Sequence, residues 1–234
     1  PGTTTITATG QSVVLNNTSN NFGTILFGSS SNAVSSVEVE DTNAIEIGTS
    51  KSTGDFKVTA GGDVTDSGTI TVSSSDATLY AITSANNGTI TLNQLAVTGT
   101  IELNTVVVSN TGDARGGDDT EITLASGADG ADDFYNSMSV YISDGTGAGQ
   151  VRTISDYDGT TKVATISSAW TTVPTTDSDY EVRSSFGDAT VVNTTSLDFE
   201  SAVVGGDFAA TATNGEITQL GALNIAGTAD FLSS

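Results

Sequence analysis

One stretch of this sequence occurs twice, on either side of an unrelated segment. The apolar and glycine positions of residues 42–68 recur in residues 195–221. Ile45 matches Leu197 and Phe56 matches Phe208, and in both copies the Phe follows Gly-Asp. Recurrence of one apolar pattern with Gly and Asp at the bends is typical of stacked β repeats. We therefore expect the two copies to occupy equivalent positions in coils that share one core.

Short alternating runs of apolar and polar residues fill the sequence around this repeat. Gly, Asn, Asp or Ser separates the runs, which are spaced roughly ten residues apart with a stronger echo near twenty. A β-sandwich also has many short strands, but here the sequence itself recurs. The pattern predicts an all-β fold, a right-handed parallel β-helix (solenoid), over residues 1–112 and 187–234. Paired Asn residues at 16–17, 20–21 and 86–87 are expected at its corners, as turn residues or as stacked side-chain ladders.

Residues 113–186 have a different character. They contain the only Trp, the only Met, four of the five Tyr and every Arg of the chain. Strand-like runs separated by Gly- and Asp-rich turns predict an inserted antiparallel β module with its own aromatic core. The loop at residues 145–149 is expected to be a hairpin turn, because no Lys-Ser/Thr follows it as in a phosphate-binding loop. Since each coil of a solenoid contacts only its neighbours, we expect such an insertion to be tolerated.

Charge and composition exclude several classes of function. With 28 acidic and 6 basic residues the net charge is −22, so nucleic acid and anionic membrane surfaces are not expected partners. His and Cys are absent, which excludes ordinary zinc and disulfide chemistry. Oxygen ligands suit calcium, and the acidic run near the start of the insert offers candidate ligands at Asp129, Asp132 and Asp133. A solvated acidic loop is the alternative, and in either case millimolar calcium is expected to raise thermal stability modestly.

The sequence also offers a few candidates for carbohydrate chemistry. Paired carboxylates at Asp63/Asp66 or Glu38/Glu40 are of the type that hydrolyses glycosides, and an exposed subset of Trp170, Tyr135, Tyr141, Tyr157 and Tyr180 could bind glycan. Against catalysis, the acidic residues are spread evenly and the expected coils contain neither Arg nor His. We expect no enzyme, and a carbohydrate-active β-helix, such as a polysaccharide hydrolase or lyase or a phage tail-spike-like depolymerase, is the alternative.

The expected coils resemble a known family. Residues 20–24, 41–48 and 54–70 are similar to the coils of filamentous-haemagglutinin-type β-helical repeat proteins, and residues 131–170 resemble a small β module of phage structural and bacterial surface proteins. The first resemblance implies an extracellular or cell-surface protein with a structural or adhesive role, in a filament, a sheath or a giant adhesin. Identical or neighbouring β-helical subunits, stacked end to end, are the expected partners, because neither end of the sequence reads as a cap.

The two ends of the sequence have the pattern of strands. Residues 1–6 and 227–232 read as mid-coil sequence, without an amphipathic helix or a polar cap. We expect this chain to lie within a longer continuous solenoid, either as an excised piece or as a subunit that stacks on others. No apolar run approaches the length of a transmembrane helix, so direct membrane insertion is not expected.

Overall fold

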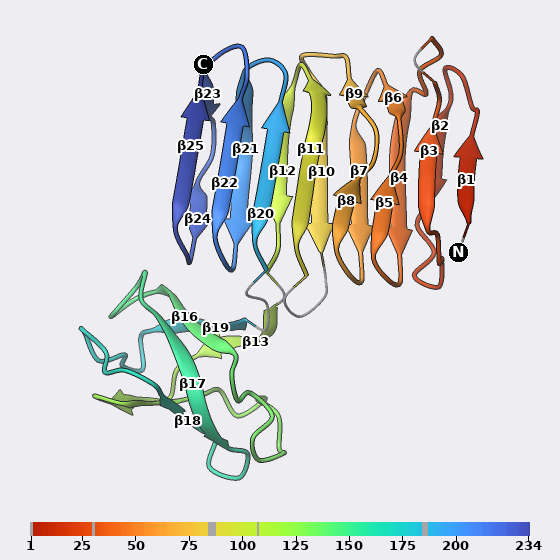
Figure 1. Ribbon diagram of the computed structural model, residues 1–234. Helices are drawn as coiled ribbons and strands as arrows, with labels where there is room; N and C mark the ends of the chain where they lie inside the picture. The colour runs from red at the N-terminus through yellow and green to blue at the C-terminus, as the bar shows by residue number, and fades with distance from the viewer. Residues whose placement is uncertain (1, 30, 84–87, 107, 184–186) are drawn as a thin grey trace. The chain divides into compact units, whose positions relative to one another are not determined.

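The computed structural model describes residues 2–29, 31–83, 88–106, 108–183 and 187–234, all but a few of the 234 residues of the chain. The chain folds into two compact units (Figure 1). One unit contains residues 1–106 and 186–234, and the other contains residues 107–185. Each unit is described by itself below.

The first unit is a parallel β-solenoid built from two sheets. The described strand pairs within each sheet are all parallel. In the first sheet the strands follow the order β1 (Thr3–Ile6), β3 (Thr24–Phe27), β5 (Ile45–Ile47), β8 (Val64–Asp66), β11 (Ile90–Val97), β20 (Ala189–Asn193), β22 (Phe208–Ala212) and β25 (Ala229–Ser233), with β6 (Ser50–Ser52) and β9 (Ile70–Val72) beside this path. In the second sheet the order is β2 (Ser12–Leu15), β4 (Ser36–Asp41), β7 (Phe56–Ala60), β10 (Thr78–Thr83), β12 (Thr100–Asn104), β21 (Leu197–Val204) and β23 (Ile217–Gln219), with β24 (Leu223–Ile225) also paired to β21.

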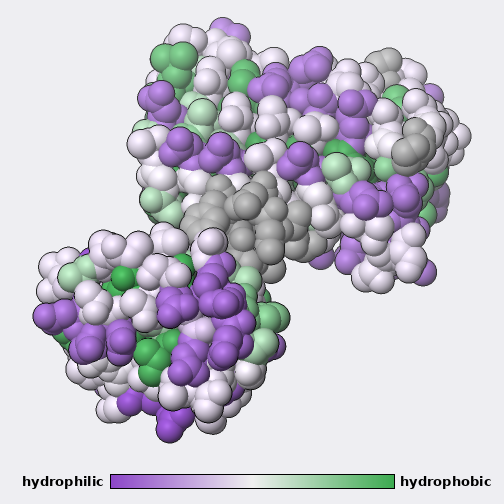
Figure 2. Space-filling model, turned by 60° about the horizontal axis from the view of Figure 1, so that its bottom comes forward, coloured by the Kyte–Doolittle hydropathy of each residue, from purple (hydrophilic) through white to green (hydrophobic). Residues whose placement is uncertain are grey.

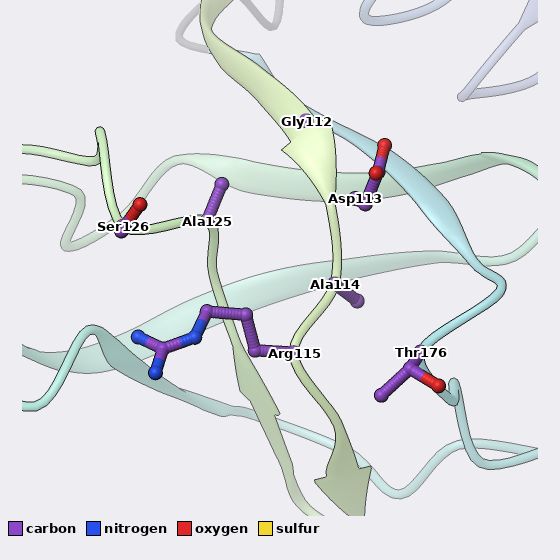
Figure 3. A pocket seen from close by; sticks show the side chains of 7 residues that line it. All are labelled: Gly112, Asp113, Ala114, Arg115, Ala125, Ser126 and Thr176. Atoms are coloured by element: carbon purple, nitrogen blue, oxygen red, sulfur yellow. The ribbon is translucent and has the colours of Figure 1, made fainter.

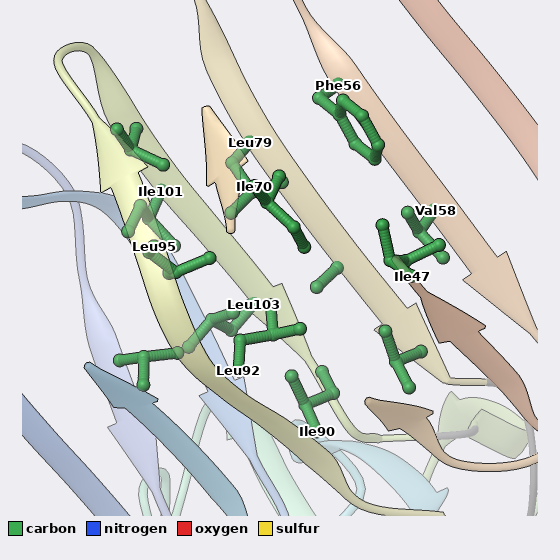
Figure 4. Close-up of a cluster of buried hydrophobic side chains, with 14 of the residues drawn as sticks. Ile47, Phe56, Val58, Ile70, Leu79, Ile90, Leu92, Leu95, Ile101 and Leu103 are labelled. Carbon is green, nitrogen blue, oxygen red and sulfur yellow. The ribbon is translucent and has the colours of Figure 1, made fainter. Parts of the chain in front are cut away.

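Alternation along the strands produces the core of the solenoid. In β7 the burial pattern is buried, intermediate, buried, intermediate, buried, as period-2 geometry requires when one face of a strand is covered. The inward side chains of both sheets form one continuous cluster (Figure 4). Aromatic rings meet edge to face across it, at 5.6 Å between the centroids of Phe27 and Phe56 and 5.4 Å between Phe199 and Phe208. The predicted fold class is confirmed, whereas the hand of the coil stays a prediction.

The repeated stretches share the core as expected but are not in equivalent positions. The matching residues are all buried in the one cluster: Ile45, Ile47, Phe56, Val58, Leu197, Phe199 and Phe208. However, β5 lies in the first sheet and its sequence match β21 in the second, and β7 and β22 are exchanged in the same way. The expectation of equivalent coil positions is therefore wrong. The reason is that the strands of both sheets begin alike, with a bend, a polar corner residue and then alternating inward apolar residues. One sequence motif can therefore begin a strand in either sheet.

The second unit is an antiparallel sheet with the order β13 (Val108–Asp113), β19 (Asp179–Arg183), β16 (Ser139–Asp144), β17 (Val151–Asp158), β18 (Val163–Ile166), β15 (Glu121–Thr123) and β14 (Gly117–Asp118). Its first and last strands, β13 and β14, follow each other along the chain. The unit has a separate core that includes Tyr135, Tyr157 and Tyr180. The expected start at residue 113 differs from the observed start at 107, because β13 pairs with β19 inside this unit.

The parallel pairing of the solenoid continues across the point at which the second unit is inserted, with one register shift between β12 and β21. β12, which precedes the insert, pairs in parallel with β21, which follows it. Two buried polar side chains of the solenoid link the coils at this junction. The hydroxyl of Thr105 donates to the carbonyl of Gly187 (2.8 Å) and accepts from the amide of Gly205 (2.9 Å). The side-chain amide of Asn193 accepts from the backbone N–H of Val97 (3.1 Å) and donates to its carbonyl (3.0 Å).

Candidate functional site

The corners of the solenoid are linked by aspartates that reach from one coil to the next. The carboxylate of Asp207 accepts hydrogen bonds from the backbone N–H (2.8 Å) and the hydroxyl (2.9 Å) of Thr228. Asp63 binds the N–H (2.8 Å) and hydroxyl (3.1 Å) of Thr89 in the same way. These bonds satisfy N–H groups that the bend removes from the strand ladder. The same role is shared by the corner aspartates, Asp55, Asp63, Asp66, Asp188 and Asp207.

This geometry explains the repeated Gly-Asp-Phe motif. The Gly lies against the neighbouring coil, and a Cβ placed on Gly54 would come within 2.8 Å of the Ser35 carbonyl oxygen. The Asp accepts from the next coil, and the Phe enters the core. Hydrogen bonds from the amide and then the hydroxyl of Thr228 hold the pKa of Asp207 below its ordinary value. The motif was visible in the sequence, but the bonding partner of each Asp lies about one coil away.

The Asn residues expected at the corners do not form a ladder with one another in the described part of the chain. The side chain of Asn17 accepts from the amide of Ser19 (2.9 Å), and that of Asn20 donates to the carbonyls of Leu15 (2.8 Å) and Glu40 (3.1 Å). Asn86 and Asn87 lie outside the described residues. Corner ladders of this solenoid are built from Asp, Thr and Ser instead.

Three of the four carboxylates considered for glycoside hydrolysis, those of Asp63, Asp66 and Glu38, have structural partners. Asp63 and Asp66 bind amides of the next coil, and Glu38 lies 3.4 Å from the ammonium of Lys57. Glu46 and Asp63 do line one groove of about 440 Å³. However, hydrogen bonds from Ser67 and Thr24 lower the pKa of Glu46, whereas a glycosidase acid needs a raised pKa. These contacts provide hydrogen-bond acceptors and coil-to-coil links rather than a proton donor.

A larger groove lies on the insert, where the chain passes from β13 toward β14. Its volume is about 680 Å³, and its lining includes Asp113, Arg115, Ser126 and Thr176. Arg115 extends toward the side of Ala125 and Ser126, whereas the Asp113 side chain points away from it (Figure 3). Asp179 lies on the neighbouring strand β19. Its pKa is raised mainly by burial and also by the nearby carboxylate of Asp113. The groove therefore combines both signs of charge and does not define one ligand class.

The three candidate calcium ligands lie in one loop but accept hydrogen bonds from three different groups. The carboxylate of Asp129 accepts from the amide of Ala131 (2.8 Å), and that of Asp132 from the amide of Gly159 (2.9 Å). Asp133 accepts from the side chain of Asn136 (2.8 Å). Within the described ranges, no three Asp, Glu, His or Cys side chains gather closely enough to hold a metal ion. The cation found beside this loop is the ammonium of Lys162, 2.9 Å from the carbonyl oxygen of Asp129.

The aromatic residues of the insert mostly have partners inside it. Tyr157 donates to the carbonyl of Asp129 (2.7 Å), and Tyr180 donates to the side chain of Asn110 (2.6 Å). Burial raises the pKa of both hydroxyls to about 12. Trp170 is buried, and Tyr141 lies under the guanidinium of Arg183, 3.9 Å from the ring centroid. These contacts support a core role for the aromatic set and do not present a stacking surface for sugar.

The glycine-rich loop at residues 145–149 is a hairpin connection, as predicted. It joins β16 and β17, which pair antiparallel. Gly145, Gly147 and Gly149 all have positive φ, at 76°, 86° and 87°. Only Gly adopts such angles readily, so the turn itself accounts for the glycines. No helix in the part of the chain described by the structure is long and apolar enough to cross a membrane.

Comparison with known proteins identifies the solenoid alone. Residues 1–27, 34–104 and 187–234 match the family described as "Repeats of unknown function (DUF5649)". The matched ranges coincide with the coils and omit the insert. Searches of curated proteins and of solved structures found no match.

Proposed function

The chain belongs to the DUF5649 family of repeats of unknown function, and we propose that it is an extracellular or cell-surface structural or adhesive solenoid. It would act as a segment or subunit of a filament, a sheath or a large surface adhesin. In this proposal it has no catalytic activity and carries the insert as an appended module. The resemblance of the coils to filamentous-haemagglutinin-type repeats supports the extracellular location and the adhesive role.

The observation that carries the proposal is that the parallel strand pairing and the core of the solenoid continue from the coils before the insert to those after it. β11 and β12, which precede the insert, pair in parallel with β20 and β21, which follow it. One apolar cluster extends from Val13 to Ala212. Because each coil contacts only its neighbours, a fold of this kind extends by repetition and lends itself to spacing and scaffolding.

The solenoid surface is also consistent with a scaffold. On the face shown in Figure 2, hydrophilic and near-neutral residues predominate and hydrophobic ones are scattered. Within the sheets, outward positions are often Thr or Ser, as at Thr65, Thr91 and Thr190, which are in register on successive strands. Short hydroxyl side chains in rows give a regular, polar face.

The proposed partner is another solenoid coil stacked on a terminal coil. Among the described strands, β25 pairs on one side only, with β22. Apolar side chains are exposed in this last coil, with Leu220 70%, Leu232 63% and Phe231 46% accessible. A strand with free backbone groups and exposed apolar residues is a template for strand addition. The occupant would be a coil of a neighbouring subunit, through a contact that does not close into a ring.

Immunogold labelling of cells that produce the protein tests the proposed location and role. We expect label on the outer surface, on filaments, a sheath or projections. Label confined to the cell interior would contradict the proposal.

Sedimentation velocity of the purified chain tests stacking. We expect the chain to associate more strongly as its concentration rises, and we expect Leu232→Asp to weaken this association. A monomer at every concentration would contradict stacking of identical subunits.

A further inference from the structure

Tyr80 is the one tyrosine of the chain outside the insert, and its ring lies on the outer face of the second sheet. Along β10, Leu79 and Ala81 are buried whereas Tyr80 and Ile82 are only partly buried, so the last two side chains point outward. The hydroxyl of Tyr80 makes no hydrogen bond with the residues that the structure describes. An aromatic ring with a free polar group is therefore presented on the surface of the solenoid.

Polar side chains flank this ring in register on both neighbouring strands. Lys57 of β7 lies on one side of the ring and Glu102 of β12 on the other. Thr59 and Asn104 flank Ile82 in the same way. Neighbouring strands are about 4.8 Å apart, so these groups are within reach of one ligand. The result is an apolar centre edged by an ammonium, a carboxylate, a hydroxyl and an amide.

A groove of about 230 Å³ leads away from Tyr80 across the strands, and its lining includes Lys57, Glu38 and Val14. These four residues are opposite one another on the successive strands β10, β7, β4 and β2. The ammonium of Lys57 lies 3.4 Å from the carboxylate of Glu38, and the two side chains are 43% and 40% exposed. The groove therefore follows the direction in which the coils stack, with one outward side chain from each coil.

The chemistry of this groove fits a sugar chain. A sugar ring has an apolar C–H face that packs on an aromatic ring, and hydroxyl groups at its edge that bond with carboxylates, amides and ammonium groups. The coil spacing of about 4.8 Å is close to the length of one sugar residue, so a linear chain presents about one residue to each coil. Glu38 and Glu102 in this row, together with the net charge of −22, disfavour acidic sugars, whereas Lys57 disfavours cationic ones.

We propose that the outer face around Tyr80 binds a linear oligosaccharide of neutral sugars, which lies along the groove with one ring stacked on Tyr80. Glu102 and Asn104 on one side, and Lys57 on the other, bond with its hydroxyl groups. The ion pair with Glu38 holds the ammonium of Lys57 in place and leaves it further N–H donors for a sugar. Such binding is a property of the coils themselves and does not depend on the location or the stacking proposed above.

Titration of the purified chain with cellotriose, chitotriose and maltotriose, followed by saturation-transfer NMR, tests the proposal. Tyr80→Ala removes the ring, and Tyr80→Phe keeps the ring without its hydroxyl. Glu102→Ala removes one of the flanking groups. Thr91→Ala, at an outward position of the first sheet, is the matched control. Trigalacturonic acid and trilysine are titrated in parallel as an acidic sugar and a basic peptide.

We expect at least one neutral trisaccharide to bind wild type and Thr91→Ala equally well. Tyr80→Ala is expected to weaken binding about tenfold and Glu102→Ala about threefold, whereas Tyr80→Phe stays within about threefold of wild type. If Tyr80→Ala does not fold, as judged by circular dichroism, Glu102→Ala decides. The proposal is overturned if no neutral trisaccharide binds at up to about 10 mM, or if binding is unchanged in the variant that decides. Binding of trigalacturonic acid or trilysine in place of the neutral sugars would also overturn it.

Discussion

At the scale of single residues, Asp207 shows how an acidic side chain holds two coils together. Its carboxylate accepts the amide and the hydroxyl of Thr228, while its own amide donates to Asp188 of the preceding coil (2.8 Å). The sequence predicts an acid beside a core Phe but not this link, because the partner of each Asp lies on the next coil. Part of the large negative charge of the chain is therefore structural.

Replacement of Asp207 tests this link. Asp207→Ala is expected to lower the melting temperature of the solenoid by a few degrees, because the Thr228 amide loses its acceptor. Asp207→Asn keeps an acceptor oxygen and is expected to melt close to wild type at neutral pH. Thermal melts followed by circular dichroism would measure both, and an Asp207→Ala variant as stable as wild type would refute the link.

The same residues predict loss of stability in acid. Hydrogen bonds lower the folded-state pKa of Glu46, Asp158, Asp177 and Asp207. The contribution of each carboxylate is fully present above the unfolded-state pKa, about 4, and is lost as the pH falls through the lower folded-state value. The melting temperature is expected to fall steadily below about pH 4. Melts between pH 7 and pH 2 measure this, and a constant melting temperature over that range would contradict it.

At the scale of strands, the sequence pattern predicts which residues turn inward but not which sheet they join. Phe56 and Phe208 are both buried, yet β7 and β22 lie in different sheets. Burial follows from alternation, which is local. Assignment to a sheet depends on the number of bends between strands, and the lengths of the coils vary. The register from Val37 to Phe56 spans 19 positions, whereas that from Val64 to Ile90 spans 26.

The polar links at the insertion junction were also invisible in the sequence. Asn193 is 1% exposed at the end of β20, and its partner Val97 lies 96 positions away. An isolated Asn after a Val-Val pair looks like an ordinary turn residue. The Gly-rich hairpin loop of the insert was predictable, because its positive φ angles are a local property of Gly. The bonds made by Lys162 were not, because they depend on a loop about thirty residues earlier.

Asn193→Ala is expected to destabilise the solenoid by about 1–3 kcal/mol, because the N–H of Val97 loses the acceptor that Asn193 provides and the carbonyl of Val97 keeps only the hydroxyl of Thr195 as a side-chain donor. Thr190→Ala, at an outward position of the same strand, is the control and is expected to change stability by less than about 0.5 kcal/mol. Denaturant unfolding measures the free energies. Equal effects of the two substitutions would show that the Asn193 bonds do not stabilise the junction.

At the scale of the whole chain, two independent cores divide the molecule. One cluster contains the solenoid residues and the other contains those of the insert. The family match covers the coils on both sides and passes over the insert. The insert is therefore an addition to a repeat architecture that continues on both sides of it.

Deletion of residues 107–186 tests whether the coils fold without the insert. Thr105 and Gly187 are joined by a hydrogen bond of 2.8 Å, so a short Gly-Ser linker between Val106 and Gly187 closes the gap. The account predicts a folded solenoid with a β-type circular dichroism spectrum and a cooperative thermal transition. A deletion variant that is recovered only as unfolded chain would contradict it, because the insert would then be part of what holds the coils together.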